Sequence, residues 1–225
     1  MIIDKKIIMK KKLINWVGLL GIISLISYAL AVTISPMAYP GYNWMEQAVS
    51  DLSADNAPSK ALWDQLSALY GSCGVVSVTC ASVFVADSKV ASGLFRTGIY
   101  LFASMNWVSE VGYHMFPLVD AGKEIASFQE VMHIVVTALV VILSITSLVV
   151  LIIAGFRQSE VRTLGRWAAI ALAMMMIGAI GTGIAPPQYF GIVERCSVFA
   201  ATGFNAVLGW YLFKGFGQSD GRIYD

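Results

Sequence analysis

Six long apolar segments constrain the fold of this chain more than any other feature. They lie at residues 13–34, 62–86, 94–116, 128–156, 164–185 and 192–213. Each is long enough for an α-helix to cross a bilayer, which takes roughly 20 residues. Proline, which ends helices because it lacks a backbone donor, follows the first segment at Pro36 and the fifth at Pro186. The sequence predicts an all-α polytopic membrane protein, a six-transmembrane-helix bundle that forms one domain over residues 1–225.

The composition supports this prediction. Hydrophobic residues make up 57% of the chain and charged residues only 13%, whereas soluble domains carry about 25% charged residues. Six helices and their connections use nearly all of the 225 residues, so no separate soluble domain is expected. The basic residues lack the interleaved aromatics of a nucleic-acid surface, which argues against a nucleic-acid partner. Membrane lipids are the expected surroundings.

The charges separate along the chain according to the side of the membrane that each connection would face. Twelve of the 15 basic residues lie in or directly beside the N-terminus, the C-terminus and the second and fourth connections, and nine of the 14 acidic residues lie on the opposite side. Basic residues in short loops are retained on the cytoplasmic side. We therefore expect a protein of the cell membrane with both termini in the cytoplasm and an acidic outer face.

The N-terminus also admits a second interpretation, a cleaved signal peptide. A basic start, an apolar core and the small residues around Ala29 and Ala31 resemble the three parts of such a peptide. The apolar stretch is longer than the roughly 7 to 15 residues of a usual signal-peptide core, which favours a retained helix. Cleavage would leave five helices and an unchanged outer face.

Small residues interrupt two of the apolar segments. The first contains Gly18 and Gly21, and the fifth contains Gly178, Gly181 and Gly183. Lipid provides no hydrophobic drive for helix association, so small residues that let two backbones approach are typical of helix contacts in membranes. We interpret these glycines as packing positions.

The first outer connection, residues 35–61, is the longest one and is therefore a candidate functional loop. Its apolar residues recur every three or four positions, at Met45, Val49 and Leu52. This spacing predicts a short amphipathic helix that lies along the outer surface. Ser50 and Asp51 would then approach the mouth of the bundle.

Ionisable residues also cluster at the outer ends of the later helices. The third helix carries Asn106, Glu110 and His114 on one face because they are spaced four apart, and the fourth begins with Glu130 and His133. The short loop between these helices brings the two histidines of the chain to one level, where the sixth helix opens with Glu194-Arg195. Ionisable groups in membrane segments are costly and usually functional.

Each of these residues also has a purely structural interpretation. Ser127 and Glu130 match the capping-box pattern of a helix start. Asp51 and Asp120 are also typical of turns and caps. Glu194 can pair with Arg195, or Arg195 can extend to lipid phosphates. His114 fits the interfacial belt beside Tyr113 and Phe116.

These positions carry a family resemblance. The pieces are Ser50-Asp51-Leu52-Ser53 in the first outer loop, Phe116-Pro117 with Asp120, His133, and Glu194-Arg195. In their order and helix positions they resemble the six-helix membrane proteins catalogued as domain of unknown function 998. The resemblance covers nearly the whole chain and implies a six-helix bundle of uncharacterised function. It does not extend to Glu110 or His114.

Two main functions remain open. The first is an outer-face hydrolase or transferase acting on a lipid or other amphiphile, with the catalytic candidates Ser50, Asp51, His133, Glu194 and Arg195. Histidine and carboxylates can hold a divalent metal such as zinc and activate water; the candidate ligands are Asp51, Glu110, His114, His133 and Glu194. Asp120 and Glu130 complete the polar cluster.

The second function is non-enzymatic: a ligand-binding, transport or assembly protein whose outer polar cluster recognises an amphiphile or a partner. A minor alternative is a haem held between His114 and His133, because haem iron accepts histidine ligands. The sequence leaves open the oligomeric state and the identity of any ligand.

Overall fold

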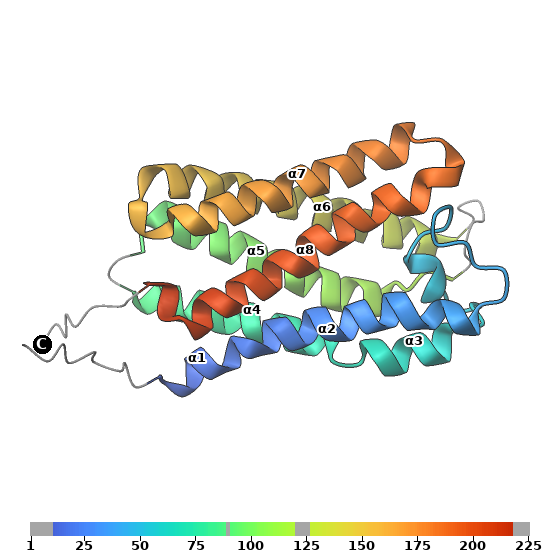
Figure 1. Ribbon diagram of the computed structural model, residues 1–225, viewed down its shortest axis with the longest axis horizontal. Coiled ribbons are helices and arrows are strands. Elements are labelled where there is room, and N and C mark those ends of the chain that lie inside the picture. The colour runs from blue at the N-terminus through green and yellow to red at the C-terminus, as the bar shows by residue number, and fades with distance from the viewer. Residues whose placement is uncertain (1–10, 89–90, 120–126, 218–225) are drawn as a thin grey trace, which may run out of the picture.

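The computed structural model describes residues 11–88, 91–119 and 127–217, and all regular structure within them is helical (Figure 1). The α-helices are α1 (Leu13–Val17), α2 (Leu19–Ile34), α3 (Lys60–Ser67), α4 (Tyr70–Asp87), α5 (Gly93–Met115), α6 (Phe128–Arg157), α7 (Arg162–Ile184) and α8 (Phe190–Phe213). Short 3-10 helices are η1 (Ser35–Ala38), η2 (Ser50–Leu52), η3 (Ser159–Val161), η4 (Pro187–Tyr189) and η5 (Gly215–Gly217).

The six predicted helices are all present in the described part of the chain. Helix α1 runs on into α2 at Gly18, and α3 runs on into α4 across Ala68 and Leu69, so each pair forms one long segment. Local sequence sets the starts of two others: Ser92 caps α5 by accepting a hydrogen bond from the Phe95 amide, and Ser127 with Glu130 forms a capping box on α6. The capping interpretation of Glu130 is therefore confirmed.

Five of these segments are long and apolar enough to cross a membrane, namely 13–38, 60–87, 128–157, 159–184 and 187–213. Helix α5 is not among them, because Arg96, Glu110 and His114 lower its hydropathy. Large apolar side chains are exposed around the outside of the bundle, including Ile26, Val83, Ile142, Ile177 and Ile180. A soluble monomer rarely exposes so much apolar surface. The chain is a membrane protein with transmembrane helices.

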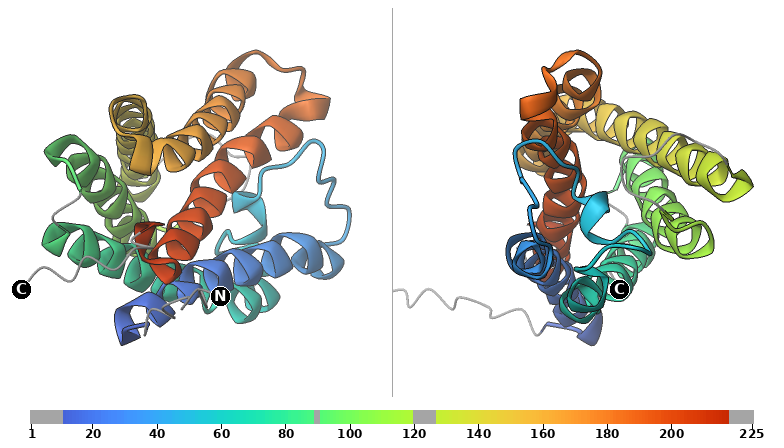
Figure 2. Two further views of the ribbon diagram at one scale, coloured as in Figure 1. Left: turned by 60° about the vertical axis from the view of Figure 1, so that its left-hand side comes forward. Right: turned by 90° about the vertical axis from the view of Figure 1, so that its right-hand side faces the viewer.

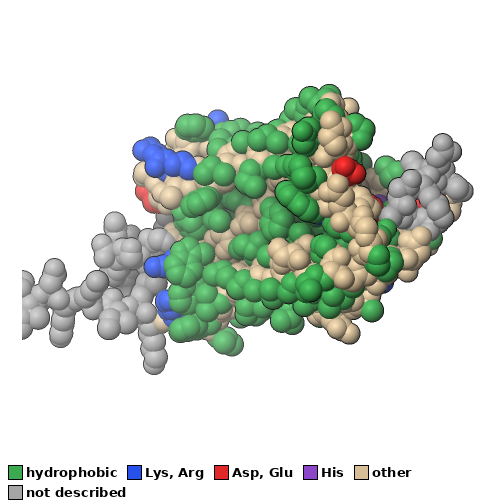
Figure 3. All heavy atoms as spheres, turned by 45° about the vertical axis from the view of Figure 1, so that its right-hand side comes forward, with side chains coloured by type: hydrophobic (Ala, Val, Ile, Leu, Met, Phe, Trp, Pro, Cys, Tyr) green, Lys and Arg blue, Asp and Glu red, His purple; other side chains and the backbone are tan. Residues whose placement is uncertain are grey.

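The helices pack side by side in the order α2, α4, α5, α6, α7 and α8, and α8 also contacts α2 and α4 (Figure 2). The larger core cluster lies among α4 to α8 and includes Phe95, Phe102, Leu148 and Leu208, each at most 2% exposed. A second cluster, with Tyr28, Val49, Leu52 and Trp63, lies beneath the long connection. In the space-filling view, Lys and Arg gather at the end of the molecule opposite this connection (Figure 3).

The predicted amphipathic helix in the first outer loop is replaced by turns and the three-residue helix η2. Val49 and Leu52 are 2% and 0% exposed, so the loop is not laid along the surface; it folds into the end of the bundle, where Figure 2 shows it crossing in front of the helices. The physical reason is that backbone carbonyls of residues 44, 45, 47 and 48 accept hydrogen bonds from outside the segment or from Tyr42. Those acceptors are then unavailable to an α-helix.

Candidate functional site

The guanidinium of Arg195 holds the long connection onto the start of α8. Its Nη1 donates hydrogen bonds to three backbone carbonyls, those of Trp44 (2.7 Å), Gln47 (3.0 Å) and Gly191 (2.8 Å). Its Nη2 donates to the phenolic oxygen of Tyr42 at 2.7 Å, and that hydroxyl donates to the Ala48 carbonyl at 2.7 Å. Arg195 therefore donates to three neutral oxygens of the loop and to one carbonyl of its own helix.

Two neighbours of Arg195 on α8 complete this attachment, which we call the loop clamp (Tyr42, Gly191, Glu194 and Arg195). The Gly191 amide donates to the Met45 carbonyl at 2.8 Å. A Cβ at position 191 would overlap the carbonyl oxygen of Gln47, so only glycine permits this approach. Glu194 Oε2 accepts a hydrogen bond from the Val49 amide at 3.2 Å. Glu194 and Arg195 thus both bind loop backbone.

Asp51 lies in η2, directly beside the clamp. Its Oδ2 accepts a hydrogen bond from the Ala48 amide at 3.2 Å. Burial raises the pKa of the Asp51 carboxyl, while the Ala48 hydrogen bond and the charge of Arg195 lower it less strongly. The charges of Asp51 and Glu194 also act on each other. Asp51, Glu194 and Arg195 are therefore three predicted site residues that the fold brings together.

Replacing Asp51 with asparagine is expected to stabilise the protein at neutral pH. A carboxyl whose pKa is higher in the folded than in the unfolded chain binds more protons when folded, so its contribution to stability falls as pH rises through that window. The window begins at the usual value of 3.8. The unfolding temperature of Asp51→Asn in detergent should exceed that of the wild type at neutral pH, and the difference should shrink towards acidic pH. A difference that stays constant with pH would contradict this assignment.

The hydrogen bonds of the two histidines do not involve the residues of the loop clamp. Nδ1 of His133 donates to the Phe116 carbonyl at 2.8 Å, and its ring packs against Tyr113 with centroids 5.1 Å apart. His114 is exposed and its Nδ1 donates to the Glu110 carbonyl at 2.6 Å. Both rings therefore hydrogen bond through Nδ1 to backbone carbonyls near the C-terminal end of α5. In each ring the second nitrogen, Nε2, takes no part in these hydrogen bonds.

The structure places the remaining predicted residues as follows. Ser50 is the first residue of η2, and its carbonyl accepts the Ser53 hydroxyl at 2.9 Å. No hydrogen bond joins Ser50 to His133 in the described part of the chain. Asp120 lies outside the described residues. Across the residues that the structure describes, no group of three or more His, Cys, Asp or Glu side chains is arranged to hold a metal ion.

A track of polar side chains leads from the acidic end into the bundle; the sequence analysis identified Glu110 and Asn106 but missed the third member, the buried Asn205. The carboxylate of Glu110 on α5 lies against Gly71 of α4, where a Cβ would overlap it. One turn deeper, Asn106 Oδ1 accepts a hydrogen bond from Asn205 of α8 at 3.3 Å. Asn205 is 3% exposed, and its own Oδ1 has no hydrogen-bond partner. Asn205 could have been noticed as a lone amide inside an apolar segment.

Residues 22–211 match a protein family described as "Protein of unknown function (DUF998)". The match runs from within α2 to near the end of α8, so it includes the loop clamp and both histidines. No curated protein and no solved structure matches the chain significantly. The family resemblance expected from the sequence is confirmed.

Proposed function

Because the chain belongs to the DUF998 family, whose function is unknown, we propose a function from its geometry: a non-enzymatic membrane protein that binds a positively charged amphiphile at its acidic end. One observation carries the proposal. Asp51, Glu110 and Glu194 are partly buried carboxylates, and none of them pairs with Lys or Arg in the described part of the chain. The described basic residues of this end are engaged elsewhere, because Lys60 pairs with Asp64 and Arg195 binds loop oxygens.

Partly buried carboxylates that form no ion pair with Lys or Arg retain part of the cost of burial, so a cationic group beside them would be bound favourably. Aromatic rings near the same end strengthen the case. Trp44 of the loop is exposed, and Tyr42 lies beside the Arg195 guanidinium. Aromatic faces attract organic ammonium groups. The apolar part of such a ligand would remain among lipid chains.

The orientation of the protein forms part of the proposal. The acidic end faces outward, both termini lie in the cytoplasm, and α5 is a sixth crossing of the cell membrane. Two contacts support α5 as a crossing: Arg96 donates to the Val85 and Ser88 carbonyls, and Glu110 faces α4, so both charges point to protein. Single cysteines at Asp55 and Arg157, in a chain without its native cysteines, would test this. In intact cells, an impermeant maleimide should label the cysteine at position 55 and should not label the cysteine at position 157.

The binding proposal predicts discrimination by charge. Purified protein in nanodiscs is titrated with hexyltrimethylammonium and, as a probe of equal chain length and opposite charge, hexyl sulfate. We expect calorimetry to show binding of the cation only. The double variant Asp51→Asn, Glu110→Gln should weaken that binding about tenfold, or ~1.4 kcal/mol. Glu194 is left unchanged because it also holds the loop.

Asp64→Asn is the matched control, because Asp64 is an exposed carboxylate at the same end that already pairs with Lys60. It should bind the cation as the wild type does. Equal binding of both probes, or equal weakening by the control, would overturn the proposal.

The hydrolase alternative is less well supported. His133 uses Nδ1 on the Phe116 carbonyl, and neither Ser50 nor a clamp carboxylate hydrogen bonds to its ring in the described chain. Glu194 and Arg195, two of the catalytic candidates, are occupied with loop backbone. The contacts of the two histidine rings likewise do not favour haem.

A further inference from the structure

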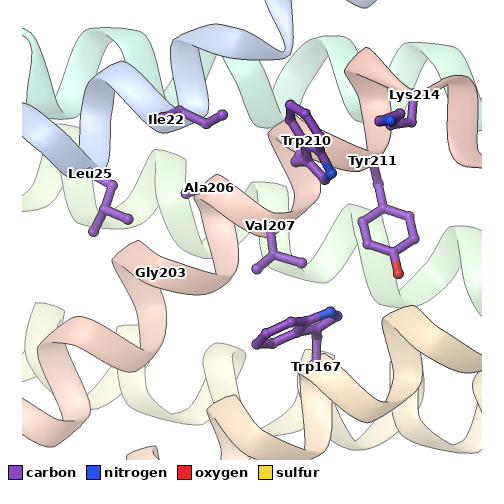
Figure 4. A pocket seen from close by; sticks show the side chains of 9 residues that line it. All are labelled: Ile22, Leu25, Trp167, Gly203, Ala206, Val207, Trp210, Tyr211 and Lys214. Atoms are coloured by element: carbon purple, nitrogen blue, oxygen red, sulfur yellow. The ribbon is translucent and has the colours of Figure 1, made fainter.

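A lateral groove of about 430 Å³ lies on the surface of α8, between α2 and α7, at the opposite half of the bundle from the loop clamp (Figure 4). Leu25 of α2 and Trp167 of α7 form its sides, and Gly203 and Val207 of α8 form part of its floor. Trp210 and Lys214 lie at its basic end. We propose that this groove binds an acyl chain of an anionic phospholipid, whose headgroup is held by Lys214.

The length of the groove indicates this occupant. Its lining on α8 extends from Gly203 to Lys214, which corresponds to about 16 Å at 1.5 Å per residue. That is about half of the ~30 Å hydrocarbon core, which is the depth of one leaflet. A partner's transmembrane helix would extend through both leaflets. A lipid chain that starts at the headgroup level needs only this half.

The shape of the groove depends on Gly203. A Cβ at this position would meet nothing within 4 Å, so the floor is open space that a methylene chain can fill. The lining is almost wholly apolar apart from Lys214. An acyl chain therefore suits the groove, whereas a polar ligand would leave its hydrogen-bonding groups unpaired there.

Charge indicates the headgroup. Lys214 is exposed, its Nζ lies 5.0 Å from the centre of the Trp210 ring, and it has no acidic partner among the residues that the structure describes. Other basic residues share this end, among them Lys11, Lys12, Arg162 and Arg166. Clusters of Lys and Arg beside membrane helices attract anionic lipids. The anchoring phosphate would sit at Lys214, with its chain running towards Gly203.

Tryptophan fluorescence provides the test, because Trp167 and Trp210 line the groove. The protein is reconstituted in phosphatidylcholine vesicles that contain equal fractions of acyl-brominated phosphatidylglycerol or acyl-brominated phosphatidylcholine. The same titration is repeated with the variant Trp167→Phe. The difference between the two titrations gives the quenching of Trp167, which lines the groove. We expect phosphatidylglycerol to quench the groove tryptophans with about fivefold higher apparent affinity, the preference that one lysine near an anionic surface provides.

Two variants and their matched controls decide the outcome. Lys214→Gln should abolish the preference for phosphatidylglycerol, and Gly203→Leu should reduce groove quenching by both lipids. Arg157→Gln removes an exposed charge at the same end on α6, and Gly183→Leu adds a side chain at a glycine of α7 that also meets nothing within 4 Å. Neither control should change the signal. Equal quenching by both lipids in the wild type, or loss of the preference in Arg157→Gln, would overturn the proposal.

Discussion

Replacing Arg195 with alanine is expected to lower the free energy of unfolding by about 2 to 4 kcal/mol, because several loop acceptors lose a charged donor at once. The carbonyls of Trp44, Gln47 and Gly191 and the Tyr42 hydroxyl all bind this one guanidinium. Lysine at position 195 keeps the charge but cannot reach as many acceptors, since it lacks the planar fork of arginine. Arg195→Lys should therefore fall between alanine and the wild type.

Reversible unfolding in mixed micelles would measure these differences, and proteolysis within residues 39–59 would report release of the loop. Lys60→Ala is the control at the same end of the bundle. Its exposed ion pair with Asp64 should contribute less than about 1 kcal/mol. If Arg195→Ala proves no more destabilising than Lys60→Ala, the loop clamp does not hold the loop.

Replacing Gly209 with alanine is expected to destabilise the bundle by about 1 to 3 kcal/mol, the usual cost of overpacking. The added Cβ would overlap the Gly18 carbonyl oxygen and lie 3.2 Å from the Cα of Gly21. Both contacts involve backbone, which cannot rotate away as a side chain can. The change must separate α8 from the α1–α2 segment, and thermal unfolding in detergent would detect the loss.

Gly203→Ala is the matched control, because Gly203 lies in the same helix and its Cβ would meet nothing within 4 Å. Alanine is a better helix former than glycine by about 1 kcal/mol, so this variant should be neutral or slightly more stable. Equal destabilisation by the two variants would show that an effect common to both positions, such as a lower folding yield, and not the approach of α8 to Gly18, explains the loss.

The candidate site was predictable only in part. Among the residues of the pattern Ser50-Asp51 with Glu194-Arg195, the fold brings Asp51, Glu194 and Arg195 together. The pattern did not reveal that Arg195 binds carbonyls of the loop, because every residue has a backbone carbonyl and the sequence does not show which ones will act as acceptors. His133 was expected beside the carboxylates, but its ring hydrogen bonds to the Phe116 carbonyl. Asn205 went unnoticed because its partner Asn106 lies 99 residues away in the chain.

The sequence by itself determined where the helices lie in the chain and which end of the bundle is basic. These properties are local, since an apolar segment of sufficient length becomes a helix wherever it packs in a membrane, and charge is read directly along the chain. Only the tertiary structure decided which helices touch, that the first outer loop enters the bundle end, and that Gly18 meets Gly209. Those features depend on the faces that distant helices present to each other, which hydropathy alone does not specify.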